Sequence, residues 1–297
     1  MVHEPVLLKE VMTGLDVHPG EILLDLTVNR GGHSRELCRQ LASHGHLIGI
    51  DADAGALKEA TDNLKICPCP VTLLEGNFRD LTQIIDGIGI GKVDAILADL
   101  GLSSQQLDES DRGFSFQRDE PLNMNLSHNT APGSLTAYQI VNFWQETSLA
   151  DVIFGYGEER FARRIAKAIV SEREVAPIST TQELVAVIKS AIPLRYQNGR
   201  RHPATKTFQA LRITVNDELG SLSAALESAW SRLNRNGRFA IITFHSLEAR
   251  LVKNFFRERV KERNAELLTK HAVRPTREEV LKNPRSRSAQ LRIIKKL

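Results

Sequence analysis

The fold of this chain is decided by the stretch Glu21-Ile22-Leu23-Leu24-Asp25-Leu26-Thr27-Val28-Asn29-Arg30-Gly31-Gly32-His33-Ser34. A short apolar run ends here in an acid, and a loop then leads to a pair of glycines at the start of a helical pattern. Glycines at such a point let the backbone approach a ligand closely, and the amides of the following helix face that ligand. This order of strand, glycine loop and helix is typical of nucleotide-like cofactor sites in α/β proteins.

The loop disfavours two common ligand classes. The loop does not match G-x-G-x-x-G, the pattern of dinucleotide-binding sites, and no P-loop Gly-Lys-[Ser/Thr] follows. Dinucleotides and nucleoside triphosphates are therefore disfavoured as ligands. Asp51 ends the next apolar run, where a carboxylate can accept hydrogen bonds from both hydroxyls of a ribose. Taken alone, the glycine pair and the acid are explained about as well by a structural turn.

Similar units follow along the chain. Short apolar runs recur at His46–Ile50, Val71–Glu75 and Val93–Ala98, and the first and last of them are followed by Asp51 and Asp99. Helical patterns separate these runs. Short continuous apolar strands that alternate with helices indicate a parallel sheet covered on both faces. We therefore predict a doubly wound, mostly parallel α/β fold of the Rossmann-like class.

The alternation stops after the fourth strand. Helical patterns such as Phe161–Val170 and Thr181–Ala191 follow, separated by turn signals. After a long helical pattern over Thr207–Asn234, buried strand patterns return at Arg238–Phe244 and Ala289–Lys295. We therefore predict one discontinuous α/β domain and a helical insertion, with bounds of 1–107 and 206–297 for the domain and 108–205 for the insertion.

The composition is that of a soluble globular protein. Hydrophobic residues make up 41% and charged residues 25% of the 297 residues, which permits a sizeable core. No apolar run approaches the ~20 residues needed to span a bilayer. The N-terminal Met1-Val2-His3-Glu4-Pro5 lacks a signal-peptide pattern. We therefore predict a cytoplasmic protein that does not interact with membranes.

The three cysteines argue against a disulfide framework. Cys67-Pro68-Cys69 has neither the spacing nor the partners of a zinc site. We therefore predict no metal site, and a pair of reduced thiols at Cys67 and Cys69.

The net charge of +3 is unevenly distributed along the chain. Residues 250–297 contain fifteen Lys or Arg and five Glu, a net charge of +10, whereas residues 1–249 carry a net charge of −7. A basic segment on an acidic body indicates a polyanionic partner, with nucleic acid first. Because Glu258, Glu262 and Glu266 are interleaved with the cations at helical spacing, a solvated charged helix explains the segment about as well.

Longer strings occur in order along nearly the whole chain. They are His3-Glu4-Pro5-Val6-Leu7-Leu8, Arg30-Gly31-Gly32-His33-Ser34, Asp99-Leu100-Gly101-Leu102-Ser103-Ser104-Gln105-Gln106-Leu107-Asp108, Arg112-Gly113-Phe114-Ser115-Phe116, Tyr156-Gly157-Glu158-Glu159-Arg160, His202-Pro203-Ala204-Thr205-Lys206-Thr207-Phe208-Gln209-Ala210-Leu211-Arg212-Ile213, Phe244-His245-Ser246-Leu247-Glu248 and Asn283-Pro284-Arg285-Ser286-Arg287-Ser288. In this series the chain resembles the bacterial family that methylates N4 of a cytidine in the decoding centre of 16S ribosomal RNA, often called MraW.

The resemblance implies a class I methyltransferase that uses S-adenosylmethionine and has 16S ribosomal RNA or the small ribosomal subunit as its partner. It also implies that the helical insertion helps to bind RNA, and it leaves the oligomeric state open, with a homodimer as one alternative. The positions that match the family's cofactor-binding residues are Gly31, Gly32, His33, Asp51, Phe78, Asp99 and Gln106. In this reading the glycines approach the methionine end, Asp51 binds the ribose, Phe78 covers the adenine and Asp99 lies beside the sulfonium.

The expected chemistry is methyl transfer to an exocyclic amine, which is a poor nucleophile because its lone pair is shared with the ring. Positioning must therefore carry most of the rate. Asp99, Ser103 and Ser104 offer hydrogen-bond acceptors near the methyl group and are the predicted catalytic residues. Phe114 and Phe116 are candidates for stacking on the target base, although aromatic residues at this spacing more often fill a core.

Three further features bear on alternative functions. His245 lacks the Gly-x-Ser-x-Gly elbow of a hydrolase, so we expect a hydrogen-bonded histidine at a strand end. Asn29 stands where the family usually has Gly, and Asn tolerates the positive φ of such a turn. Signature charges of the family are also missing, at Asn123, Asn125 and Ser127. A methyltransferase for another nucleotide or RNA, and a non-catalytic paralogue that binds RNA and cofactor, therefore remain as alternatives.

Overall fold

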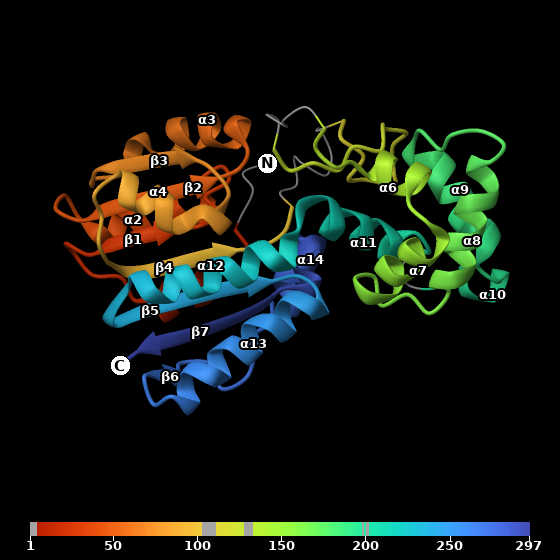
Figure 1. Cartoon of the computed structure of the whole chain (residues 1–297). Coiled ribbons are helices and arrows are strands. Elements are labelled where there is room, and N and C mark those ends of the chain that lie inside the picture. The colour runs from red at the N-terminus through yellow and green to blue at the C-terminus, as the bar shows by residue number, and fades with distance from the viewer. Residues whose placement is uncertain (1–4, 103–110, 128–132, 198, 200–201) are drawn as a thin grey trace. The chain divides into compact units, whose positions relative to one another are not determined.

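The computed structural model describes residues 5–102, 111–127, 133–197, 199 and 202–297 (Figure 1). The chain forms two compact units. Unit 1 consists of Met1–Gly101 and Leu219–Leu297, and unit 2 is the intervening segment Leu102–Glu218. The bounds of these units differ from the predicted ones of 1–107 and 206–297 for the α/β domain and 108–205 for the insertion. The chain leaves unit 1 after Gly101 and returns to it after Glu218.

Unit 1 is built around a seven-stranded sheet in the order β3-β2-β1-β4-β5-β7-β6. Its strands are β1 Ile22–Asp25, β2 His46–Asp51, β3 Val71–Glu75, β4 Val93–Asp99, β5 Leu233–Thr243, β6 Ala265–Leu267 and β7 Gln290–Lys296. The strands from β3 to β5 pair in parallel, and β7 is antiparallel to both β5 and β6. The predicted doubly wound, mostly parallel fold is confirmed.

Helices cover both faces of this sheet. Successive side chains of a strand point to opposite faces, so Leu23 of β1 packs in one apolar cluster and Leu24 in the other. The helices in the cluster of Leu23 are α1 Leu8–Leu15, α2 Gly32–Leu41 and α3 Ala54–Asn63. Those in the cluster of Leu24 are α4 Leu81–Gly87, α12 Glu218–Arg232 and α13 Ser246–Lys261. Full burial of each such leucine contributes roughly 1.5–3 kcal/mol, which keeps the sheet between its two helical layers.

Short elements complete unit 1. They are the 3-10 helices η1 Leu64–Ile66, η2 Phe78–Asp80 and η3 Pro284–Ser288, and the helix α14 Arg277–Lys282. Two of them, η1 and η2, lie in the connections around β3 and therefore help to shape the ends of the parallel strands.

Unit 2 is helical. It contains α6 Ala137–Phe143, α7 Glu146–Gly155, α8 Ala162–Arg173, α9 Thr181–Ala191, α10 Leu194–Gln197 and α11 Thr205–Asn216. Capping boxes begin two of these helices: the Thr136 hydroxyl accepts the backbone N–H of Gln139 before α6, and the Thr180 hydroxyl accepts that of Glu183 before α9. Side chains of α6 to α9 and α11 form one buried apolar cluster. Within the described part of the chain, no helix has the length and apolar character needed to cross a membrane.

The prediction of one long helix over Thr207–Asn234 is wrong. Helix α11 ends at Asn216, and Asp217 adopts a left-handed conformation with a φ of 45°. A new helix begins at Glu218, and β5 already starts at Leu233. Asp is one of the few residues that enter the left-handed region at modest cost, so a single residue breaks an otherwise continuous helical pattern.

Candidate cofactor site

Three acids lie at the carboxyl ends of neighbouring strands in unit 1. Asp25 ends β1, Asp51 ends β2 and Asp99 ends β4. The sheet order places β1 between β2 and β4, so the chain crosses over beside β1. Open α/β sheets bind their ligands at such a switch point, outside the carboxyl ends of the strands. The structure therefore gathers the two acids that the sequence singles out, together with Asp25.

The loop after β1 forms the wall beside these acids. Asn29 has a φ of 48°, so the predicted positive φ at this position is confirmed. Its backbone N–H donates to Asp51 Oδ2 over 2.8 Å. Gly31 has a φ of 79°, and a Cβ there would lie 3.0 Å from Leu64 Cγ. A Cβ on Gly32 would lie 2.9 Å from Pro5 Cγ, so a side chain at Gly32 would force Pro5 to shift, whereas at Gly31 the positive φ is the main reason for glycine.

His33 lies buried in the first turn of α2. Its Nε2 is 2.9 Å from the carbonyl oxygen of Val6, and its Nδ1 is 3.5 Å from Asp99 Oδ2. The next residue, Ser34, donates its hydroxyl to Asp25 Oδ2 over 2.5 Å. The start of α2 thus contacts the ends of both β1 and β4.

Asp99 is the most unusual acid of the site. Its backbone N–H donates to the Thr27 hydroxyl over 2.6 Å, but its buried Oδ1 has no hydrogen-bond partner among the described residues. Burial, followed by the charges of Asp25 and Glu248, raises the pKa of Asp99 well above its usual value. Burial also raises the pKa of Asp25 to about 6. A cation placed here would offset the repulsion between these acids and give Asp99 Oδ1 an electrostatic partner.

Asp51 is held in a different way. Its Oδ2 accepts the N–H of Asn29, and its Oδ1 accepts the N–H of Asp53 over 2.9 Å. Burial raises the pKa of Asp51, and backbone hydrogen bonds from Asp53, Asn29 and Ala52 oppose that rise. A carboxylate has about four lone-pair sites, so acceptor capacity remains beyond these backbone bonds. Asp51 can therefore accept hydrogen bonds from a pair of hydroxyl groups.

Phe78 is brought toward Asp51 by the backbone. The N–H of Gly76, directly after β3, donates to the carbonyl oxygen of Asp51 over 2.9 Å. Phe78 follows two residues later as the first residue of η2, where the side chain of Asn77 accepts the N–H of Arg79. The Phe78 side chain is half-buried. An aromatic ring at this place can cover a flat ring bound next to Asp51.

Of the predicted site residues, the structure gathers Gly31, Gly32, His33, Asp51 and Asp99 at one edge of the sheet, with Phe78 on the neighbouring turn. Ser103, Ser104 and Gln106 lie outside the described residues.

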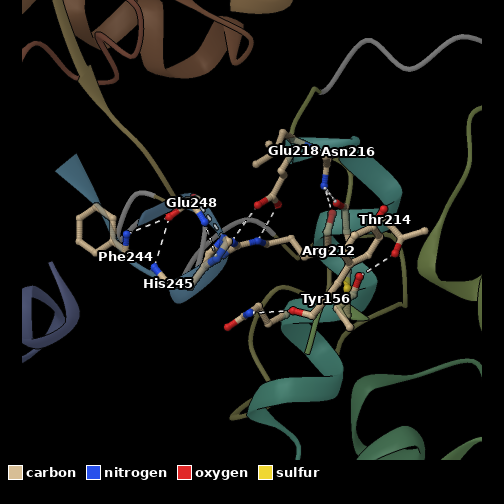
Figure 2. A network of polar contacts seen from close by, with 12 residues as sticks. Tyr156, Arg212, Thr214, Asn216, Glu218, Phe244, His245 and Glu248 are labelled. Carbon is tan, nitrogen blue, oxygen red and sulfur yellow. Dashed lines mark hydrogen bonds and ion pairs between the residues drawn. The ribbon is translucent and has the colours of Figure 1, made fainter. Parts of the chain in front are cut away.

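The sequence prediction omits Asp25 and Glu248. Asp25 ends a strand as Asp51 and Asp99 do, and this shared pattern could have identified it. Glu248 lies in a capping box at the start of α13: its Oε2 accepts the backbone N–H groups of Phe244 and His245 over 2.9 and 3.2 Å (Figure 2). His245 Nδ1 accepts the N–H of Glu248 in return, so the expected hydrogen-bonded histidine is confirmed.

In unit 2, the two aromatic candidates for base stacking lie in different surroundings. Phe114 is only 6% exposed and belongs to the helical core, so the core-filling alternative holds for it. Phe116 stacks on the ring of His202, with 4.5 Å between the centroids. Figure 2 also shows Arg212, whose guanidinium binds both carboxylate oxygens of Glu218 at 2.7 and 2.9 Å.

The family departures Asn123 and Asn125 contact each other. Asn123 Oδ1 accepts both the backbone N–H and the side-chain amide of Asn125, over 3.0 and 2.9 Å. The amide of Asn125 also donates to the carbonyl oxygen of Leu135. These neutral residues therefore hold the loop without the charges that the family usually has there.

The prediction of reduced thiols at Cys67 and Cys69 is wrong for Cys67. The structure has a disulfide between Cys38 on α2 and Cys67 directly after η1, and their Cα atoms are 5.6 Å apart. Cys69 is a free, buried thiol. The two bonded cysteines are 29 positions apart, so only the packing of α2 and η1 could bring them together.

Comparison of the whole chain with known proteins identifies related sequences. The chain matches the MraW methylase family over residues 1–297. It is 46% identical to the ribosomal RNA small subunit methyltransferase H of Symbiobacterium thermophilum, covering 99% of this chain and 96% of that protein. It is 42% identical to the protein of the same name from Clostridioides difficile, covering 99% of each.

Among solved structures, a putative rRNA-methylase from Clostridium thermocellum is similar over 100% of both chains, with 12% identity and a TM-score of 0.47. Because the family match spans the whole chain and close relatives share more than 40% of their residues with it, this chain belongs to the MraW methylase family.

Proposed function

We propose that this chain is an S-adenosylmethionine-dependent methyltransferase of small-subunit ribosomal RNA, and that its target is N4 of a cytidine in the decoding centre of 16S ribosomal RNA. The observation that carries this function most directly is the half-buried Asp99 carboxylate at the switch point, whose buried Oδ1 has no partner among the described residues. Relatives at 42–46% identity bear the name of a ribosomal RNA small subunit methyltransferase, which supports the substrate class.

The residues of the site fit this cofactor. S-adenosylmethionine, when bound, supplies an electrophilic methyl group on a cationic sulfonium. Asp99 would lie beside that cation, where a buried carboxylate is favourable. Asp51 would accept the ribose hydroxyls, and Phe78 would cover the adenine. Gly31, Gly32 and His33 would hold the methionine end, and Gln106, outside the described residues, completes the proposed set.

Catalysis would rest on positioning the amine. The Asp99 carboxyl group can accept a hydrogen bond from an exocyclic amine, which aims the nitrogen at the methyl group and restricts its rotation. We propose Ser103 and Ser104 as further acceptors on the segment that follows β4. Since the target base must leave its stack to reach a strand end, binding has to include an unstacking step.

Basic side chains would bind the phosphates of the RNA. On unit 1, Arg250, Arg257, Arg274, Arg285 and Arg287 are exposed. Burial, followed by the charge of Arg257, lowers the pKa of Arg292. Cations that repel one another are stabilised by a bound phosphate, which fits a polyanionic partner. Sequence adds Arg195, Arg200, Arg201 and Lys206 in the proposed RNA-binding unit 2, of which Arg200 and Arg201 lie outside the described residues.

We also propose the cytoplasm as the compartment, because the substrate is part of the ribosome. The function is tested by deleting the gene and mapping modified cytidines in the small-subunit RNA. A single cytidine should lose its N4-methyl group and regain it when the wild-type chain is supplied, but not when Asp99→Ala is supplied. Loss of a methyl group at another nucleotide would favour the alternative substrate. An unchanged RNA, together with measurable S-adenosylmethionine binding, would favour the non-catalytic paralogue.

A further inference from the structure

We infer that Cys38 and Cys67 form a thiol–disulfide site that controls how firmly unit 1 holds the Gly31-Gly32 loop, and through it the affinity for S-adenosylmethionine. This inference rests on the proposed function, because it takes the glycine loop as the cofactor loop. It adds a chemical modification of the protein itself to that function.

The two cysteines are placed for reversible bonding. Their Cα atoms are 5.6 Å apart, within the range of 4.4–6.8 Å seen for disulfides. Cys38 is fully buried on α2, whereas Cys67 is half-buried between the exposed residues Ile66 and Pro68. A small thiol or disulfide can therefore reach Cys67 from solvent, and Cys38 lies directly behind it.

Cys69 supplies a contrast within the same segment. It is a free thiol that is only 6% exposed, and burial raises the pKa of its thiol. A buried thiol that resists ionisation reacts slowly, because the thiolate is the nucleophile. Cys69 therefore serves as an internal control, since it shares the surroundings of Cys67 but not its exposure or its partner.

The two cysteines lie on or directly after elements that contact the cofactor loop. Cys38 belongs to α2. This helix begins with Gly32 and His33, and the ring of His33 lies beside Asp99. Cys67 directly follows η1, whose Leu64 packs against Gly31: a Cβ there would lie 3.0 to 3.3 Å from three atoms of that leucine. The disulfide thus ties the helix that begins at Gly32 to the segment whose Leu64 supports the loop.

Polar contacts join the same two segments. The side-chain amide of Asn63 donates to the carbonyl oxygen of Arg30 over 3.0 Å, and Arg30 forms an ion pair with Glu59 of α3 at 3.0 Å. The Arg30 and Glu59 side chains are each about 40% exposed, so water competes for this pair. When the disulfide is reduced, η1 stays beside the loop through these exposed polar contacts and the apolar packing of Leu64, without the covalent tie.

The bond also closes a ring that contains the ribose acid. The cysteines are 29 positions apart, and the enclosed segment includes β2 with Asp51 at its end. Closing such a ring removes conformations from the opened state of this segment, which favours the closed arrangement. The oxidised protein should therefore present the glycine loop and Asp51 in a more ordered form and bind the cofactor more tightly.

The redox step is balanced by a small-molecule disulfide such as oxidised glutathione. The Cys67 thiolate attacks one sulfur of that disulfide, forms a mixed disulfide and releases one small thiol. The Cys38 sulfur then attacks Cys67 Sγ, forms the S–S bond and releases the second small thiol. The protein loses two electrons and two protons, and the small disulfide gains them.

The test compares the full chain equilibrated with oxidised or with reduced glutathione. Alkylation of a denatured sample and its intact mass count the free thiols, and calorimetry on the folded protein measures the Kd for S-adenosylmethionine in each verified state. We expect one alkylated thiol, Cys69, after oxidation and three after reduction. We also expect about fivefold tighter cofactor binding in the oxidised protein, a coupling of ordinary size.

Two variants complete the design. Cys67→Ser replaces a half-exposed thiol and should bind the cofactor with the affinity of the reduced protein under both conditions. Cys69→Ser should keep the full response. The inference fails if the oxidised wild type still has three thiols, if the two verified states bind equally well, or if Cys67→Ser retains the response. A chain that binds no S-adenosylmethionine in either state would instead overturn the proposed function.

Discussion

The raised pKa of Asp99 leads to a prediction about charge. S-adenosylmethionine has a cationic sulfur, whereas the sulfur of S-adenosylhomocysteine is neutral, and the two ligands are otherwise nearly the same shape. Loss of hydration, followed by the charges of Asp25 and Glu248, raises the pKa of the half-buried Asp99. Raising the pH should therefore strengthen the binding of S-adenosylmethionine relative to S-adenosylhomocysteine.

The sign follows from the protonation of the free protein. Below the raised pKa the Asp99 carboxyl group is neutral, so binding the cation requires release of a proton. Each pH unit then changes the ratio of the two dissociation constants by up to tenfold, or about 1.4 kcal/mol, for one linked proton. Above the raised pKa the carboxylate is already charged, and the ratio should reach a plateau.

The assay is calorimetry with both ligands from about pH 5 to about pH 9, a range that brackets a strongly raised carboxyl pKa. Asp99→Asn keeps the shape but cannot ionise, so its ratio should not change with pH. Asp25→Asn removes the neighbouring charge and should move the midpoint for Asp99 to lower pH. A ratio that stays constant in the wild type, or that still varies with pH in Asp99→Asn, would refute a charge role for Asp99.

Four other outcomes are expected. Asp25→Asn should raise the free energy of unfolding by about 3 kcal/mol above pH 6 but not below pH 4, because a pKa raised from 3.8 to about 6 costs the wild type stability as the pH rises through this window; urea denaturation at several pH values measures it, and a pH-independent difference would contradict it. Asp51→Ala should weaken S-adenosylmethionine binding by roughly 1.5–3 kcal/mol while leaving the fold intact, since a charged acceptor of two hydroxyls is lost; calorimetry and circular dichroism check both parts, and an unchanged Kd would leave Asp51 as a strand-end acid only. Gly31→Ala should destabilise unit 1 by about 1–2 kcal/mol, because its φ of 79° is unfavourable for a residue with a Cβ; thermal unfolding against Gly87→Ala, where a Cβ meets nothing within 4 Å, gives the matched comparison, and equal shifts would argue against strain. Arg257→Glu combined with Arg287→Glu should weaken RNA binding and reduce the slope of log affinity against log salt by about 0.7 per lost phosphate contact on single-stranded RNA; cofactor affinity should stay the same, and an unaffected slope would make both arginines solvated surface.

Much of this fold could be predicted because its signals are local. Continuous apolar runs of strand length, each followed by a loop and a helical period, specify a parallel sheet covered on both faces. Asp51 and Asp99 also indicate where strands end, because a charged side chain is unfavourable inside a strand that is buried on both faces. The positive φ of Asn29 agrees with the residue type, because Asn tolerates this conformation better than most residues.

Other features depend on which segments become neighbours. The apolar sequence of each strand does not determine the order of strands in the sheet. That order places β1 between β2 and β4, which brings Asp25 close enough to raise the pKa of Asp99. The break at Asp217 leaves no mark in the sequence pattern, because a single left-handed residue keeps the apolar period intact on both sides.

The sequence by itself therefore determined the alternation of strands and helices and the kinds of side chain at the strand ends. Only the tertiary structure decided which of those side chains interact. The pairing of Cys38 with Cys67, rather than a reduced Cys67 beside Cys69, is the plainest case. A disulfide needs two Cα atoms within a few ångströms, and packing of α2 against η1 sets that distance across 29 positions of sequence. Local residue preferences act over a few positions, whereas such contacts form only when the whole sheet and its helices have assembled.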